Sequence, residues 1–119
     1  MMRRILTVSI LGACAASSAC AWADCTPPDA TVISIPNGTT ATRDQMIAAQ
    51  RAVKAYDTAV KAYGDCLQQQ LDNQVAAGGN KETLSVQYDK MNNDQVFKLQ
   101  KLADKFNEEL RAFKARNSG

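Results

Sequence analysis

The sequence predicts an all-α protein, a long antiparallel two-helix hairpin that resembles a coiled coil, with an extended N-terminal strap tied to it by a disulfide. Three observations predict this fold. Apolar residues recur at helical spacing over two stretches of equal length, a Gly-Gly-Asn turn separates these stretches, and Cys25 precedes the first stretch while Cys66 lies inside it.

Residues 1–23 have the features of an export signal. Arg3 and Arg4 give a basic start, an apolar run follows, and Ala21-Trp22-Ala23 places small residues where a signal peptidase reads them. The apolar run is shorter than the roughly 20 residues that span a membrane. We therefore expect a mature chain that begins at Asp24 and is periplasmic or secreted.

A lipoprotein signal is the alternative interpretation of this segment. Leu11-Gly12-Ala13-Cys14 is similar to a lipobox, in which Cys14 would carry the lipid. That processing would leave Cys20, Cys25 and Cys66 in the mature chain, whereas cleavage after Ala23 leaves one pair, Cys25 and Cys66. In an oxidising compartment an even number of cysteines favours the pair, so we expect a Cys25–Cys66 disulfide.

The net charge depends on the export segment. The whole chain has 14 basic and 12 acidic residues, and loss of Arg3 and Arg4 leaves 12 of each. The mature chain is therefore neutral overall, and nothing in its global charge suggests nucleic-acid binding.

Residues 24–41 form a proline-rich leader. This segment holds all three prolines of the chain and the turn signal Asn37-Gly38, so a helix is disfavoured. Its apolar cluster of Val32, Ile33 and Ile35 suggests an extended strap that docks on the helices.

The first helix is predicted over residues 42–77. Thr42 and Gln45 have the spacing of a capping box, and Gly78-Gly79 follows as a stop signal. The segment AVKAY occurs twice, seven residues apart, and the heptad spacing creates an apolar seam. Its members are Val53, Tyr56, Val60, Tyr63 and Leu67.

The second helix is predicted over residues 81–116, after the N-cap Asn80. Its apolar spacing is interrupted at Asn92-Asn93-Asp94, which indicates either a register shift within one helix or the cap of a separate helix. We prefer one helix. Residues 117–119 are expected to fray.

The predicted disulfide satisfies a test of reach. Cys66 lies 24 residues past Thr42, or about 36 Å along a helix. The 17 residues from Cys25 to Thr42 span about 53 Å when extended. The strap can therefore run back along the first helix and meet Cys66.

Residue types argue against an enzyme. The chain has no histidine, and Cys25 and Cys66 lack the CxxC spacing of redox pairs. Glu108-Glu109 is interpreted as part of a solvated helix face. We predict no catalytic, cofactor-binding or metal-binding residue, and we expect a non-enzymatic protein.

Basic residues gather near the end of the second helix, where they could bind an anionic surface or simply form a solvated face. The candidates are Lys98, Lys101, Lys105, Arg111 and Lys114.

The order of Cys25, a proline-rich leader, Val53-Lys54-x-Tyr56 and Tyr63-x-x-Cys66-Leu67 resembles small exported bacterial proteins of unassigned function. This resemblance implies a periplasmic or secreted location and a structural role for the two cysteines. It implies no activity or ligand.

Two functions are compatible with these features. The first is a protein-interaction or structural module of the bacterial envelope, whose partner is another protein or a second copy in a homodimer, because Met46, Ile47 and Val96-Phe97 are expected to lie off the seam. The second is an envelope-surface protein held by a Cys14 lipid or by the basic end of the second helix.

Overall fold

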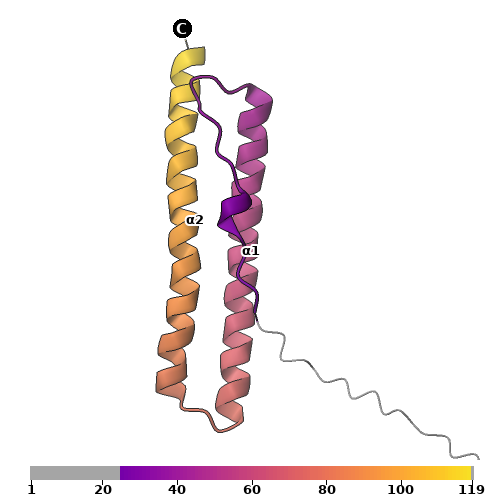
Figure 1. Ribbon diagram of the computed structural model, residues 1–119, viewed down its shortest axis with the longest axis vertical. Helices are drawn as coiled ribbons and strands as arrows, with labels where there is room; N and C mark the ends of the chain where they lie inside the picture. Colours follow the sequence, from indigo (N-terminus) through magenta and orange to yellow (C-terminus); the bar gives the residue numbers. More distant parts are fainter. Residues whose placement is uncertain (1–24, 119) are drawn as a thin grey trace, which may run out of the picture.

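A computed structural model describes residues 25–118. Within this range α1 spans Arg43–Ala76, α2 spans Lys81–Asn117, and a short 3-10 helix, η1, spans Ala30–Val32. The two long helices run antiparallel and form a hairpin, with the strap along one side (Figure 1). The all-α hairpin is confirmed, whereas the predicted signal segment, residues 1–23, and Cys14 lie outside the described residues.

The ends of α1 follow from local sequence. Gln45 N donates to Thr42 Oγ1 at 3.2 Å and Thr42 N donates to Gln45 Oε1 at 2.8 Å, which forms the predicted capping box. At the other end Gly78 has a φ of 99°, and Gly79 N donates to Gln74 O at 2.9 Å. This Schellman geometry stops the helix and turns the chain.

α2 is a single helix that passes through Asn92-Asn93-Asp94. It starts at the Asn80 cap, whose Oδ1 accepts from Thr83 N at 3.0 Å. It ends at Asn117, one residue later than predicted, where the Asn117 side chain donates to Phe113 O at 2.8 Å. Asn117 therefore belongs to the helix and not to a frayed tail.

The helix interface contains the predicted seam. Tyr56, Val60, Tyr63 and Leu67 are buried and Val53 is half-buried. Met46 is also buried, in a cluster at the end where α1 begins, so the expectation that it lies off the seam is wrong. This cluster consists of Ala41, Met46, Ala49 and Phe106, with Ile35, Val53, Leu110 and Phe113 packed against it.

A polar layer explains why the asparagines do not break α2. Gln95 is buried and its Oε1 accepts from Tyr56 Oη at 2.8 Å. One turn away, a Cβ added to Gly64 would lie 2.9 Å from Asn92 Oδ1, so the glycine leaves room for the asparagine side chain. The helix therefore continues through the apolar interruption, where a buried Tyr56–Gln95 hydrogen bond and the space at Gly64 accommodate polar side chains in the interface.

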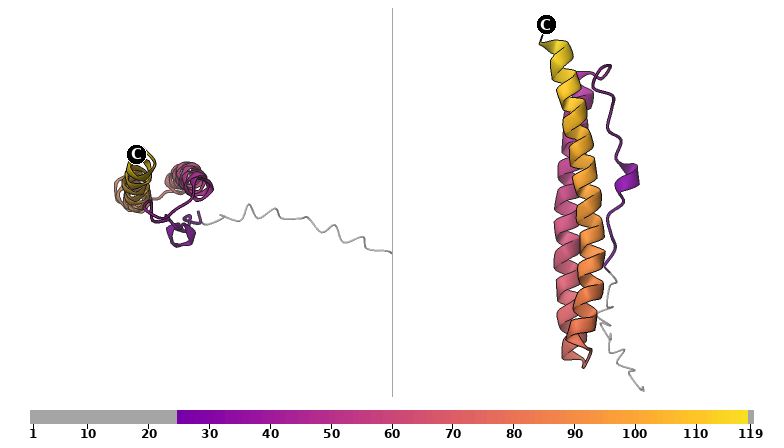
Figure 2. Two further views of the ribbon diagram at one scale, coloured as in Figure 1. Left: turned by 90° about the horizontal axis from the view of Figure 1, so that it is seen from above. Right: turned by 90° about the vertical axis from the view of Figure 1, so that its left-hand side faces the viewer.

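The strap lies along one side of the hairpin (Figure 2). Cys25 and Cys66 form the predicted disulfide, with 5.8 Å between their Cα atoms. Ala52, Ala59 and Cys66 are seven residues apart and half-buried, as expected for the α1 face beneath the strap. Ile33 and Ile35 are half-buried as predicted.

Two details of the strap differ from the prediction. Val32 is 77% exposed and does not dock. The strap is also not extended throughout, because η1 tightens it after Asp29, whose Oδ1 accepts from Thr31 N at 2.9 Å.

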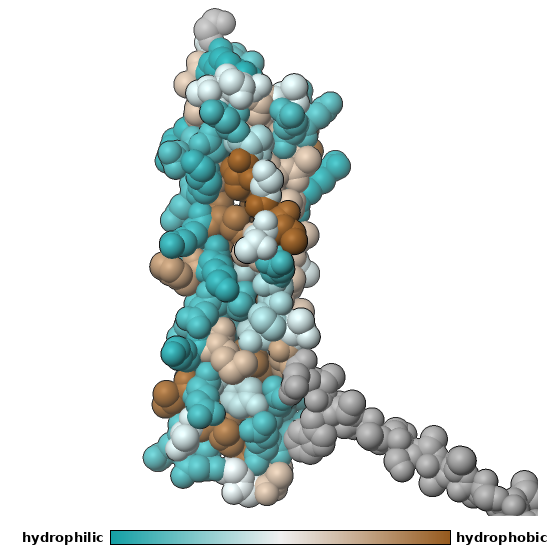
Figure 3. Space-filling view, viewed as in Figure 1, coloured by the Kyte–Doolittle hydropathy of each residue, from teal (hydrophilic) through white to brown (hydrophobic). Residues whose placement is uncertain are grey.

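The apolar side chains on the strap face gather mainly between the helices, towards the end where α1 begins and α2 ends (Figure 3).

A second attachment holds the strap where it turns into α1. Gly38 N donates to Glu109 Oε2 at 2.6 Å. Arg116 donates to Thr39 O at 2.7 Å and also to Ala41 O. We call Gly38, Glu109 and Arg116 the strap latch, because α2 uses it to hold the strap at the end opposite the disulfide.

Candidate interaction surface

The hairpin has two long grooves between its helices, and the strap covers one of them from Cys66 to the start of α1. Successive residues of an α-helix are rotated by about 100°. Gln50 and Gln68 therefore lie on the side of α1 opposite the strap, because they are 16 and 2 residues from Cys66. Both side chains are exposed. We call the side that they mark the strap-free groove.

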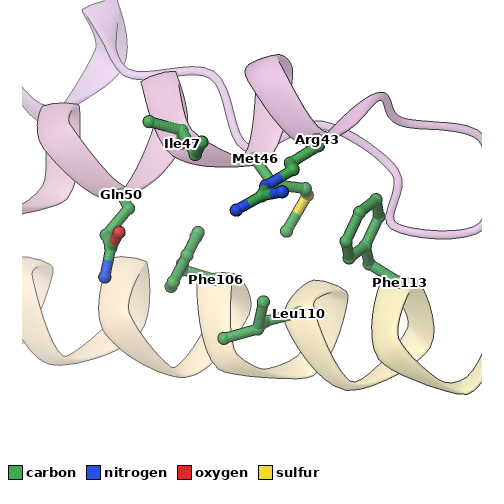
Figure 4. Close-up of a pocket in the computed structure, with 7 residues that line it drawn as sticks. All are labelled: Arg43, Met46, Ile47, Gln50, Phe106, Leu110 and Phe113. Atoms are coloured by element: carbon green, nitrogen blue, oxygen red, sulfur yellow. The ribbon is translucent and has the colours of Figure 1, made fainter. Parts of the chain in front are cut away.

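The strap-free groove has an apolar hollow at the end of the hairpin where α1 begins and α2 ends, which we call the open end (Figure 4). The hollow has a volume of about 180 Å³ and contains no strap residue. Arg43 lies in its wall and forms no ion pair within the part of the chain described here. The lining residues are Arg43, Met46, Ile47, Gln50, Phe106, Leu110 and Phe113.

The same groove has a second hollow near the α1–α2 turn, which we call the turn end. It is larger, about 510 Å³, and combines the apolar Leu71 and Val75 with two carboxylates, Asp72 and Asp89, and one cation, Lys81. A third hollow, about 300 Å³, lies on the strap side beside Cys25 and Tyr88. The strap-free groove therefore carries an apolar hollow with an arginine at the open end and a mixed polar and apolar hollow, with two carboxylates and one lysine, at the turn end.

The predicted basic residues of α2 do not form one patch. Lys105 is 3.0 Å from Glu109 Oε1 and 3.9 Å from Glu108 Oε2. Lys101 Nζ lies 4.8 Å from the centre of the Phe97 ring, which is 57% exposed. At 100° per residue, Lys98, Lys101 and Lys105 lie within about 60° of one another on one face of α2. Arg111 and Lys114 are also exposed, but each lies at least about 80° around the helix from that face.

The titratable groups with shifted pKa values have structural causes. Burial raises the pKa of the Tyr56 and Tyr63 hydroxyls. The Gly38 N–H and then Lys105 lower the pKa of Glu109, and Glu109 in turn raises the pKa of Lys105. Tyr56 and Tyr63 belong to the helix interface, and Glu109 belongs to the strap latch, with Lys105 beside it. None of these four residues lines one of the three hollows.

The described residues contain neither a group of metal-binding side chains nor a membrane-spanning helix. No three histidine, cysteine or acidic side chains between residues 25 and 118 are grouped so as to hold a metal ion. No helix in this range is long and apolar enough to cross a membrane.

Comparison with known protein families, with curated proteins and with solved structures gives no significant match.

Sequence reasoning did not identify the strap latch. The sequence pattern predicts a turn at Asn37-Gly38 and a solvated helix face at Glu108-Glu109. Yet the Glu109 side chain is only 14% exposed, because the turn covers it. The pairing joins residues 71 positions apart. The signal in the sequence was a glycine at the tip of a turn, which permits close approach of two backbones.

Proposed function

We propose that this protein is a non-enzymatic, exported interaction or structural module of the bacterial envelope. One observation carries the proposal: the strap covers one groove of the hairpin from Cys66 to the open end, while the other groove keeps an apolar hollow at the open end and a mixed hollow with apolar residues at the turn end. A two-helix protein that has its own strap for one groove and an uncovered apolar groove on the other side is suited to binding a further protein surface.

Export is supported by two features. The export segment precedes Asp24, and the disulfide between Cys25 and Cys66 is a bond that persists in oxidising compartments. The same features are typical of small extracytoplasmic proteins, which use such bonds to supplement a thin core.

The test is capture of partners from envelope extract with the oxidised mature protein as bait. Ile47→Glu places a charge in the open-end hollow. Phe97→Glu is the matched control, because Phe97 is an exposed apolar residue that lines none of the three hollows. We expect the wild type and Phe97→Glu to retain a partner that Ile47→Glu loses. Identical capture by all three baits would refute the groove as the interaction surface.

A second candidate function is attachment to the membrane surface. It is favoured by Lys101, which lies over the exposed Phe97 ring, since a basic and aromatic pair of this kind suits an anionic lipid interface. The Cys14 lipid is the other route to the same location. The intact mass of the mature protein tests the lipid, and flotation with anionic vesicles tests the basic surface, with Phe97→Glu expected to abolish flotation.

A further inference from the structure

Folding separates the charges of this protein along its long axis. The hydrogen bond between Tyr56 and Gln95 divides the hairpin into an open-end part and a turn-end part. The open-end part, residues 25–55 and 96–118, has nine basic and five acidic residues, for a net charge of +4. The turn-end part, residues 57–94, has three basic and six acidic residues, for a net charge of −3.

The strap-free groove has the same polarity. Arg43 lines the hollow at the open end, whereas Asp72, Asp89 and Lys81 line the hollow at the turn end, where the two carboxylates outnumber the one cation. An occupant that matches both ends must place carboxylates near Arg43 and a cation near the two aspartates. It must also present apolar side chains to both hollows.

A second copy of this chain meets these requirements in one orientation. Two hairpins that pair groove to groove with twofold symmetry are either parallel or antiparallel. The parallel pair would place the two positive ends together and the two negative ends together, which is repulsive. The antiparallel pair places each positive end on a negative end, with Arg43 of one copy beside the Asp72 end of the other.

We propose that the strap-free groove is the interface of an antiparallel homodimer, in which two hairpins form a four-helix bundle and the two straps lie on its outer faces. The inference rests on the proposed function, since it names the partner of the same groove. The new interface is continuous with the α1–α2 interface and follows the same packing rules. The strap disfavours the same pairing on the other side of the hairpin, because it covers that groove from Cys66 to the open end.

The antiparallel geometry fixes which residues face each other. In this arrangement α1 of one copy packs antiparallel on α1 of the other, and with full overlap the twofold axis passes through the centre of Arg43–Ala76. Two residues from different copies then face each other when their numbers sum to about 119. Gln50 of one copy therefore faces Gln68 of the other. The two Gln50 residues are then about 28 Å apart along the axis, at 1.5 Å per residue. Both glutamines are exposed and remote from the strap.

Crosslinking provides the first test. Gln50→Cys and Gln68→Cys proteins, each with the native disulfide intact, are treated with a short bismaleimide separately and as a mixture. We expect a crosslinked dimer from the mixture only. Crosslinking of the single variants alone, or dimers in solution that fail to crosslink as a mixture, would overturn the antiparallel arrangement.

Sedimentation velocity provides the second test. We expect a dimer whose dissociation constant rises at least about tenfold between about 0.05 M and about 0.5 M NaCl, because screening weakens the end-to-end attraction. Ile47→Glu should be monomeric and Phe97→Glu dimeric. A wild-type protein that stays monomeric at about 100 µM in low salt refutes the dimer.

The two proposals fail in different experiments. A monomer that still captures an envelope protein through Ile47 refutes the dimer and leaves the interaction function standing. A dimer with the expected crosslinks supports the inference even when the envelope extract yields no other protein.

Discussion

Gly38→Ala offers the sharpest test of how the strap is held. Gly38 is buried at the tip of the strap turn, and its φ is not positive, so its requirement for glycine comes from space. A Cβ at this position would lie 1.8 Å from Glu109 O and 2.9 Å from Phe113 N. Both are backbone atoms of α2, which cannot move aside as a side chain can.

The size of the effect follows from this geometry. The turn must retreat by more than 1 Å to reach an ordinary contact, which lengthens the 2.6 Å bond from Gly38 N to Glu109 and pulls Thr39 O away from Arg116. Overpacking of this kind costs about 1–3 kcal/mol. For a domain of this size a loss of about 2 kcal/mol lowers the Tm by roughly 8–16 °C.

The assay combines thermal unfolding with amide hydrogen exchange. Exchange should accelerate over residues 33–41, while the protein around Cys25 stays attached through the disulfide. Gly64→Ala is the matched control, since its Cβ would meet only the flexible end of Asn92 at 2.9 Å. There the gain in helix propensity, up to about 1 kcal/mol, should leave stability unchanged or higher. An unchanged Tm and unchanged strap exchange in Gly38→Ala would refute the close approach.

Three further predictions follow from the disulfide, the latch and the polar layer. Reduction, or Cys66→Ser, should cost about 4 kcal/mol in the chain-entropy model for a sequence separation of 41 residues, and equal melting curves of oxidised and reduced protein would contradict it. The pKa of Glu109 is lowered in the folded state, so its contribution is present above the ordinary value of 4.5 and is lost as the pH falls through the lowered pKa. The protection factor of the Gly38 amide, which compares its exchange rate with the intrinsic rate at the same pH, should therefore fall below pH 4.5 in the wild type but not in Glu109→Gln, whose side chain does not titrate. Tyr56→Phe should cost about 1–3 kcal/mol, because Gln95 Oε1 stays buried without its donor, and the additional change Gln95→Leu should restore most of this loss in denaturant unfolding.

The sequence by itself determined the parts of this protein that depend on neighbouring residues. Heptad spacing marked Val60, Tyr63 and Leu67 as interface residues, the Thr42–Gln45 spacing marked the start of α1, and glycines marked its end. The disulfide was also predictable, because cysteine number left one pair and helix length allowed it to close.

Only the tertiary structure decided which distant residues meet. The latch joins Gly38 to Glu109, and the polar layer joins Tyr56 to Gln95, and neither pairing has a periodic signal in the sequence. The charge polarity is also a product of folding. A basic start of α1, an acidic middle and a basic end of α2 give a neutral mature chain, and the hairpin brings the two basic segments side by side. Helical periodicity reports local geometry, whereas these pairings depend on how two helices and a strap align over dozens of residues.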